Sequence, residues 1–435
     1  MKNFFFSVML SVAALAFAQS PLNAPWMQQL QLQKNGTEPT YQEIVDAGTA
    51  YFDSIDKDAK GSGYKPFMRW IETAKQFVKD DGSLQTNAEL DAIINDRFIA
   101  KGVTADDSNW FPNGPYGVIG TGSWSTGQGR VNAIAVDPNN ASTYYIGAPG
   151  GGVFKSTDAG ATWTPLTDFI SRVGASAIAI DPNNSNIVYV GTGDDDGGDA
   201  PSIGMLKSID GGATFSPTGL TFPGSSSEIT EIYISPTNSN ELFIATNVGF
   251  FKSTNAGASV SLTFSGDVKD IKLKPGDANT IYLTANGGFY ISTNAGNTFT
   301  RVTSGLPNGV GRMVLAVTPA NAQYVYILAI DGSAGLLGLY RSTNGGTTFS
   351  KRDNGVDILE NSQGFYDLAM EVSPTDANRV YTGCLNVWAS SNGGSTFTKI
   401  NSWSSPSQPS YTHADIHQIR AFGNTLFVAS DGGIY

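Results

Sequence analysis

A short motif recurs six times between residues 156 and 397. Its sharpest copy is Ser156–Trp163 (STDAGATW), and a second copy is Ser208–Phe215 (SIDGGATF). The remaining copies are Ser253–Val260, Ser292–Phe299, Ser342–Phe349 and Ser390–Phe397, and consecutive copies start 52, 45, 39, 50 and 48 residues apart. A period of about 20 to 50 residues is typical of repeat architectures. The chain is therefore expected to fold as an array of similar units.

The residue types of the motif predict a tight turn between two strands. Asp or Asn at the third position can bond the backbone two residues on, and Gly at the fifth position can take a positive φ. The aromatic at the eighth position favours the start of a strand. Six copies of a folding element are easier to explain than six copies of a catalytic group. We therefore interpret the motif as a structural turn, with its third position at Asp158, Asp210, Asn294, Asn344 and Asn392 in the clearer copies.

A second pattern precedes each motif copy. Every unit begins with an alternating apolar segment that ends near a proline, as in Val131–Pro138 and Ile229–Pro236. A polar turn, a second strand such as Ile187–Gly191, a glycine-rich turn and a third strand such as Gly152–Ser156 follow. Four short strands per period are typical of a β-propeller blade. The prediction is an all-β propeller of about seven four-stranded blades, the last one incomplete, with a small α-helical N-terminal region.

The motif resembles the Asp-box of BNR-type repeats. The run Gly150–Gly160 (GGGVFKSTDAG), with the recurring Asp-Pro-Asn turns, resembles the sortilin N-terminal family. It is also similar to xyloglucanase-type propellers and to photosystem assembly factors. The resemblance covers residues 110–435. It implies that the first strand of each blade lines a central channel, that ligands bind where these strands start, and that the Asp-box turns lie on the opposite face.

The sequence ends within a seventh unit. Ile416–Phe422 and Thr425–Ser430 match the first two strands of a blade, and Asp431–Tyr435 matches the start of a third. No further motif copy follows, so we expect a chain truncated within its last blade. Alternatively, Asn109–Pro112 resembles the fourth strand Thr162–Pro165 and would close a ring of seven blades.

The N-terminus has the features of a signal peptide. Lys2 supplies the positive charge, Phe4–Phe17 the apolar stretch, and Ala16-Phe17-Ala18 the small-x-small cleavage pattern. Cleavage after Ala18 would leave Gln19 first. We expect a secreted or cell-surface protein without a transmembrane segment. This leader and the aromatic helical region resemble exported propeller proteins of the Bacteroidetes type, often sorted by a type IX secretion signal, although no such C-terminal domain is visible.

Residues 19–108 are predicted to be a helical region, followed by the propeller at residues 109–435. Tyr41–Ile55 and Tyr64–Val78 carry apolar residues at helical spacing, and Asn87 can cap a third helix that runs to Ile99. The aromatics of Tyr64–Trp70 either pack on the propeller or on each other, or they bind a ligand.

Charge and cysteine content restrict the function classes. The net charge of −12 argues against nucleic acid, since phosphate binding needs a basic surface. The chain has one cysteine, Cys384, so an internal disulfide is excluded. We expect Cys384 to be a small buried residue rather than a reactive thiol, and the protein to be a monomer.

The starts of the predicted first strands are rich in charged residues, which form a candidate ligand site at the channel mouth. Exposed strand starts are often polar without any function, and this alternative stays open. The candidate ligand-binding residues are Arg130, Arg172, Glu231, Asp270, Arg312, Asp367, His413, Asp415 and His417.

The segment His413–His417 contains both histidines of the chain. In an extended strand, residues 413, 415 and 417 would point to one side, with neighbours about 6.6 Å apart. The two histidines would then be too far apart to bind one metal ion without a bend. Asp415 and His417 are the candidates for acid–base catalysis, and the alternative is a hydrogen-bonded channel lining.

The acidic loop Asp194–Asp199 is a candidate calcium site. Ca²⁺ takes oxygen ligands from such glycine-containing loops, with Asp194, Asp196 and Asp199 as the predicted ligands. A solvated acidic loop is the alternative. No other cofactor is indicated.

Two functions remain open. The first is an exported propeller that binds an extracellular protein or polysaccharide without chemistry. The second is a glycoside hydrolase of the xyloglucanase-like type, which needs a pair of carboxylates that this sequence does not single out. No phosphate-binding loop, Gly-x-Ser-x-Gly turn or sialidase Arg-Ile-Pro run is present.

Overall fold

The computed structural model describes residues 24–34, 37–57, 59, 62–86, 89, 127, 129–170, 173–198, 200–222, 227–360 and 362–435. The chain divides into two compact units, residues 1–100 and 101–435. The predicted signal peptide lies outside the described residues. Within them, none of the helices is long and apolar enough to cross a membrane.

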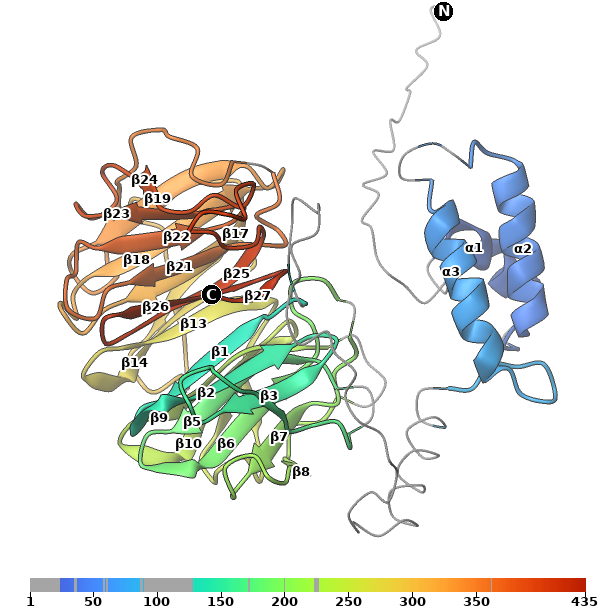
Figure 1. The fold of residues 1–435 in the computed structure, drawn as a ribbon, viewed down its shortest axis with the longest axis horizontal. Helices are drawn as coiled ribbons and strands as arrows, with labels where there is room; N and C mark the ends of the chain where they lie inside the picture. Colours follow the sequence, from blue (N-terminus) through green and yellow to red (C-terminus); the bar gives the residue numbers. More distant parts are fainter. Residues whose placement is uncertain are drawn as a thin grey trace, which may run out of the picture. The chain divides into compact units, whose positions relative to one another are not determined.

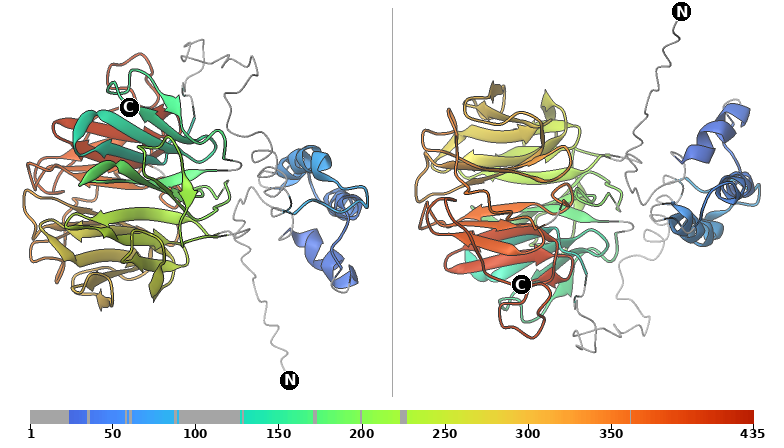
Figure 2. Two further views of the ribbon diagram at one scale, coloured as in Figure 1. Left: turned by 90° about the horizontal axis from the view of Figure 1, so that it is seen from below. Right: turned by 90° about the horizontal axis from the view of Figure 1, so that it is seen from above.

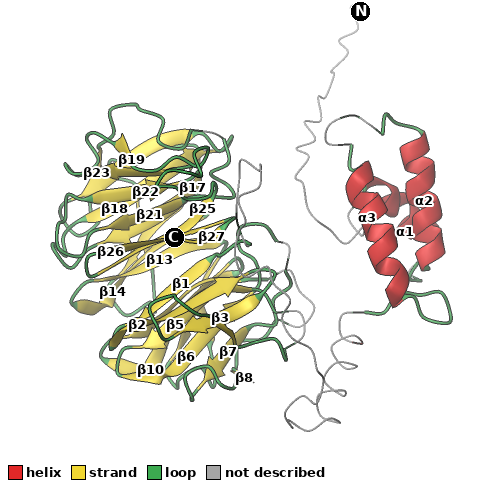
Figure 3. Ribbon diagram, viewed as in Figure 1, coloured by secondary structure: helices red, strands yellow, loops and turns green. Residues whose placement is uncertain are grey.

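The N-terminal unit is helical, and all the helices coloured red in Figure 3 belong to it. Its elements are α1 (Pro25–Lys34), α2 (Tyr41–Asp53), α3 (Tyr64–Ala74) and the 3₁₀ helix η2 (Lys75–Phe77). Thr40 and Glu43 form a capping box that starts α2. The rings of Trp26, Phe52 and Phe67 pack together with centroids 5.1 Å apart, so the aromatics of this unit pack on one another. The helix predicted from Asn87 falls almost wholly outside the described residues.

The second unit is a seven-bladed β-propeller, which confirms the predicted fold class (Figure 1). Within each blade, strands that are consecutive in sequence are antiparallel neighbours. Six blades have four strands, and the described residues give the last blade three.

The strands of the first three blades are β1 (Ala133–Asp137), β2 (Asn140–Ala148), β3 (Gly152–Ser156), β4 (Thr164–Pro165), β5 (Ala175–Asp181), β6 (Asn184–Thr192), β7 (Met205–Ser208), β8 (Ser216–Pro217), β9 (Ile229–Ser235), β10 (Asn238–Thr246), β11 (Gly249–Ser253) and β12 (Ser261–Ser265).

The strands of the remaining blades are β13 (Val268–Lys274), β14 (Asp277–Ala285), β15 (Gly288–Ser292), β16 (Thr300–Val302), β17 (Val310–Val317), β18 (Val325–Asp331), β19 (Leu336–Ser342), β20 (Ser350–Lys351), β21 (Ala369–Val372), β22 (Val380–Gly383), β23 (Val387–Ser390), β24 (Thr398–Lys399), β25 (Ile416–Phe422), β26 (Thr425–Ser430) and β27 (Gly433–Ile434).

The hydrophobic core lies between the blades. Seven clusters of buried apolar residues each join two neighbouring blades, because every sheet has apolar residues on both faces. The cluster of Val131, Ile134, Phe427 and Ala429 joins the last blade to the first. In Figure 2 the red strands of the last blade lie beside the blue-green strands of the first. The ring of blades is therefore closed by hydrophobic packing as well as by a hydrogen bond from Val131 N to Ser430 O, 3.0 Å long.

Each motif copy forms a turn between the third and fourth strands of its blade. In the first copy, Ser156 Oγ donates to Asp158 Oδ1 (2.7 Å) and accepts from Gly160 N (2.8 Å). Asp158 also accepts from the backbone N–H and the hydroxyl of Thr162. The fifth position has a positive φ as predicted, 87° at Gly160, but so does the fourth, 58° at Ala159. This second left-handed residue was not predictable from residue type, because alanine occupies the position in three copies.

Candidate functional site

The antiparallel order of the strands gives the propeller two distinct faces. The first strands start, and the second strands end, on one face, which we call the mouth face. The turns between third and fourth strands, with all six motif copies, lie on the other face. Residues before β9, β21 and β25, and the loop between β6 and β7, therefore belong to the mouth face.

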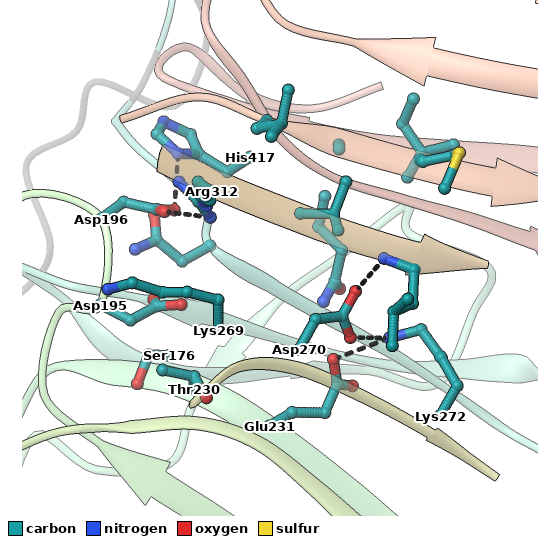
Figure 4. Close-up of a pocket in the computed structure, with 18 of the residues that line it drawn as sticks. Ser176, Asp195, Asp196, Thr230, Glu231, Lys269, Asp270, Lys272, Arg312 and His417 are labelled. Carbon is teal, nitrogen blue, oxygen red and sulfur yellow. Dashed lines mark hydrogen bonds and ion pairs between the residues drawn. The ribbon is translucent and has the colours of Figure 1, made fainter. Parts of the chain in front are cut away.

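The first strands surround a central channel, and their register decides which residues face it. In β5, β9, β13, β17 and β25 the pairing shifts by one residue near the start, which leaves Ser176, Thr230, Lys269, Gly311 and His417 as β-bulges. In β13, β17 and β25 the residue after the bulge and the one two further on line the channel, and several of the bulge residues line it as well. Charged residues at these positions surround a cavity of about 50 Å³ (Figure 4).

A segment of the second blade closes the mouth of this channel. It comprises residues 193–198, between β6 and β7, and we call it the plug. Asp196 Oδ1 accepts a hydrogen bond from Arg312 Nη2 (3.1 Å) and Asp196 Oδ2 lies 2.8 Å from His417 Nδ1. Asp194 is paired with Arg130 and accepts from Asn132 Nδ2 (3.0 Å). The plug thus connects the second blade to the first, fifth and seventh blades across the mouth.

His417 lies at the centre of this network. Its side chain is fully buried, and its Nε2 lies 2.8 Å from Asp431 Oδ1. With a carboxylate at each ring nitrogen, both nitrogens must donate, so the ring is an imidazolium. Burial alone would lower the pKa of His417, but the hydrogen bonds to Asp196 and Asp431 raise it to about 9.

Tyr366 extends the network toward Arg130. Its hydroxyl donates to Asp431 Oδ1 (2.8 Å) and accepts from Arg130 Nη1 (3.0 Å). Its ring meets the ring of His417 edge-on, with centroids 4.8 Å apart. Burial would raise the pKa of Asp431, but the hydrogen bond from His417 and the nearby cations lower it. The mouth therefore contains alternating charges that are joined by these hydrogen bonds.

A second ionic network lies deeper in the channel, apart from the first in Figure 4. Lys272 is paired with Asp270 and lies 3.1 Å from Glu231. Glu231 also lies 2.8 Å from Arg420, which is 3.7 Å from Glu371. Glu231 and Asp270, predicted to bind ligand, are thus neutralised inside the channel.

Two further acids lie between blades six and seven. Asp367 is fully buried and accepts from Cys384 Sγ (3.1 Å), while Asp415 accepts from Gln363 Nε2 (3.3 Å). Burial, with a contribution from the charge of Asp415, raises the pKa of Asp367 to about 8. Burial also raises the pKa of Glu228, before β9, to about 7. Asp367 and Glu228 can therefore carry a proton near neutral pH.

The segment 413–417 is not a continuous extended strand, so the condition under which residues 413, 415 and 417 would point to one side is not met. Asp415 has a φ of 62°, β25 begins only at Ile416, and His417 is a bulge residue. His413 Nδ1 contacts the carbonyl oxygen of Ala414, at 3.0 Å, whereas His417 contacts the plug. The two histidines therefore do not share one side of an extended strand.

Two predicted site residues, Arg172 and Asp199, lie outside the described residues. In the part of the chain that the structure describes, no group of three or more His, Cys, Asp or Glu side chains could hold a metal ion. Asp194 and Asp196 point toward different cations, so both are satisfied without calcium. With Asp199 outside the description, the calcium site stays a prediction.

Several residues of the two ionic networks were not predicted from the sequence as site residues. Lys272 and Arg420 occupy the second channel-facing position of β13 and β25, where β17 has Val314, and Glu371 lies in β21 near Arg420. Each of these residues is a charged residue inside an otherwise apolar strand, and this pattern could have identified them in the sequence. Asp431 had no such signal, because it lies in an ordinary-looking turn between β26 and β27.

Comparison with solved structures shows the same propeller fold in proteins of different kinds. The GH74 xyloglucanase from Xanthomonas campestris matches with a TM-score of 0.55 and 17% identity, over 71% of this chain and 52% of the enzyme. The structure "YCF48 bound to D1 peptide" matches with a TM-score of 0.50 and 13% identity, over 73% and 98%. The extracellular domain of the hybrid two-component system BT4673 from B. thetaiotaomicron matches with a TM-score of 0.52 and 14% identity, over 73% and 39%.

These likenesses show the fold alone, and they confirm the predicted similarity to xyloglucanase-type propellers at that level. The chain spans about half the length of the GH74 enzymes that it resembles. No family model and no curated protein matches the sequence.

Proposed function

We propose that the protein is an exported propeller that binds a polysaccharide on its mouth face without cleaving it. One observation carries the proposal: the channel mouth is filled by the plug and its ion pairs. Hydrolysis of a glycosidic bond needs two available carboxyl groups on either side of the bond. At the mouth, Asp194, Asp196 and Asp431 are each paired with a cation, so none of them is available as the acid or the base of a hydrolysis reaction.

The mouth face also offers apolar side chains for a ligand. Phe365, beside Arg312, is 63% exposed, Phe169 is 45% exposed and Val248 is 43% exposed. All three lie in connections on the mouth face. Exposed aromatic rings among polar groups are typical of ligand-binding surfaces, and sugar rings pack well on them.

A glycoside hydrolase is the second candidate. It is favoured by the raised pKa values of Glu228 and Asp367, because a carboxyl group protonated near neutral pH can act as a general acid. The GH74 enzymes with the same fold support it only as an analogy.

A panel of soluble polysaccharides separates the two functions. The full chain is tested for retardation in affinity gels and, in parallel, for release of reducing ends. Binding without products supports the proposal. Products that disappear in Glu228→Gln, Asp367→Asn or Asp415→Asn would establish a hydrolase, and binding only to proteins would assign a protein ligand.

Export is the second part of the proposal. It rests on Lys2, the apolar stretch Phe4–Phe17 and the cleavage pattern that ends at Ala18. N-terminal sequencing of the mature protein from a secreting host should give Gln19 as the first residue. An intact N-terminus at Met1 would contradict it.

A further inference from the structure

The mouth contains a carboxylate-binding site that the chain fills with its own side chain. We propose that Arg312 and His417 form a receptor for the carboxylate of a uronic acid at the end of a glycan, which enters by displacing Asp196 and the plug. This inference rests on the proposed glycan-binding function and names the sugar that the mouth accepts.

The receptor is built independently of its present occupant. Arg312 is held from the side by the carbonyl oxygen of Phe365, which accepts from Nη1 at 2.9 Å. His417 is held from the far side by Asp431, 2.8 Å from Nε2. The side chain of Arg312 is 11% exposed and that of His417 is fully buried. Two fixed donors therefore converge on one carboxylate position, which Asp196 occupies.

Asp196 does not use the full donor set of Arg312. Its Oδ1 accepts from Nη2 and its Oδ2 faces His417. Within the described residues, the buried Nε of Arg312 has no partner. Arginine binds carboxylates best through two parallel N–H groups. A ligand carboxylate can take Nε and Nη2 together, and in doing so it satisfies a donor that Asp196 leaves unmet.

The plug is attached in a way that allows it to leave. It begins at Gly193, with a φ of 116°, and ends at Gly198, with a φ of 66°. Its ion pairs across the mouth are made by Asp194 and Asp196, Asp195 lines the cavity beside them, and none of its residues belongs to a hydrophobic cluster. Glycines absorb large backbone rotations, and ion pairs can be exchanged for those of a ligand.

The surroundings favour a singly charged sugar over an acidic peptide. Asp415 and Glu228 lie on the same mouth face, so this surface offers carboxyl groups rather than further cations to a second or third carboxylate of a peptide. The hydroxyl groups of a sugar can instead donate to Asp415 and Glu228. Phe365, whose carbonyl oxygen holds Arg312, is exposed and offers an aromatic surface for the sugar ring.

The first experiment removes the Asp196 carboxylate that occupies the receptor. In Asp196→Ala, millimolar acetate or glucuronate should raise the melting temperature, while glucose at the same concentration and ionic strength should not. Asp210→Asn, on the opposite face and isosteric with the Asn of other motif copies, is the matched control and should show no carboxylate effect. If Asp196→Ala does not fold, Asp196→Ser gives the same readout. A folded variant that acetate and glucuronate fail to stabilise would overturn the receptor.

The second experiment uses the unmodified chain and calorimetric titration. An oligosaccharide that ends in glucuronate should bind at least tenfold tighter than the same oligosaccharide that ends in glucose. If the two oligosaccharides bind equally well, the proposed glycan-binding function stands and the carboxylate receptor is overturned. Tighter binding of an Asp/Glu-rich peptide would overturn the assignment to a sugar. Failure of both glycans to bind would overturn the proposed function and this inference about the native protein.

Discussion

His417 and Asp196 lie 2.8 Å apart across the channel mouth, although 221 residues separate them in the sequence. The contact joins the seventh blade to the second and places a buried imidazolium between two carboxylates. It explains why the mouth is closed, and it makes the stability of the propeller depend on the protonation of one ring.

Stability should therefore fall at alkaline pH. The pKa of His417 rises from 6.5 to about 9 on folding, so its contribution is complete below pH 6.5 and is lost as the pH rises through 9. A shift of this size corresponds to about 3 kcal/mol. Denaturant unfolding from pH 6 to 10 should show this loss in the native chain. His417→Gln should lack it, and a native chain with unchanged stability over that range would exclude a charged His417.

The motif turns should tolerate an amide at their third position, but they should lose stability when this side chain is truncated to alanine. Asp158→Ala removes the acceptor for Ser156 and Thr162 and should lower the stability of the propeller, as loss of a helix cap does for a helix. Asp158→Asn should lower it clearly less, because Asn294 makes the corresponding bonds to Ser292 and Thr298. Denaturant-induced unfolding of the two variants gives their free energies of unfolding. Equal losses of this free energy in both variants would contradict the turn assignment.

Two glycines with similar backbone angles should respond differently to alanine. Gly305 has a φ of 77°, and a Cβ there would lie 1.8 Å from the carbonyl oxygen of Phe349. Gly309 has a φ of 71° with no atom within 4 Å of a Cβ. Gly309→Ala should cost about 1 kcal/mol from strain alone. Gly305→Ala should cost several kcal/mol more because a buried backbone must move, and similar thermal shifts for both would disprove this packing.

The deeper network should be sensitive to loss of its lysine. Lys272→Met leaves Asp270 buried without its cation, which should destabilise by about 3 to 5 kcal/mol. Lys351→Met is the control, because Lys351 is 51% exposed and 3.6 Å from Asp353, and its loss should cost under about 1 kcal/mol. Unfolding in urea at pH 7 gives both values. A small effect at Lys272 would mean that the channel is well hydrated.

The fold was predictable because its signals are local and repeated. The motif at Ser156 and its five copies mark the third turn of each blade, and alternating apolar segments such as Val131–Pro138 mark the first strands. A pattern that returns every 39 to 52 residues identifies blades without any long-range information.

The mouth was only partly predictable. The polar strand starts did indicate which residues gather there, among them Arg130 and Arg312. The bulge at His417 and the left-handed Asp415 break the simple alternation on which the strand geometry was predicted. The partner of His417 comes from a loop five blades earlier in the sequence, and no local pattern specifies that Asp196 reaches it.

The most direct test of the account is the polysaccharide panel on the full chain, with bound protein and released reducing ends measured in the same samples. We expect at least one polysaccharide to retain the protein in the gel. No reducing ends should be released, because the plug carboxylates are paired with Arg130, Arg312 and His417. Release of reducing ends that is abolished in Glu228→Gln or Asp367→Asn would contradict it.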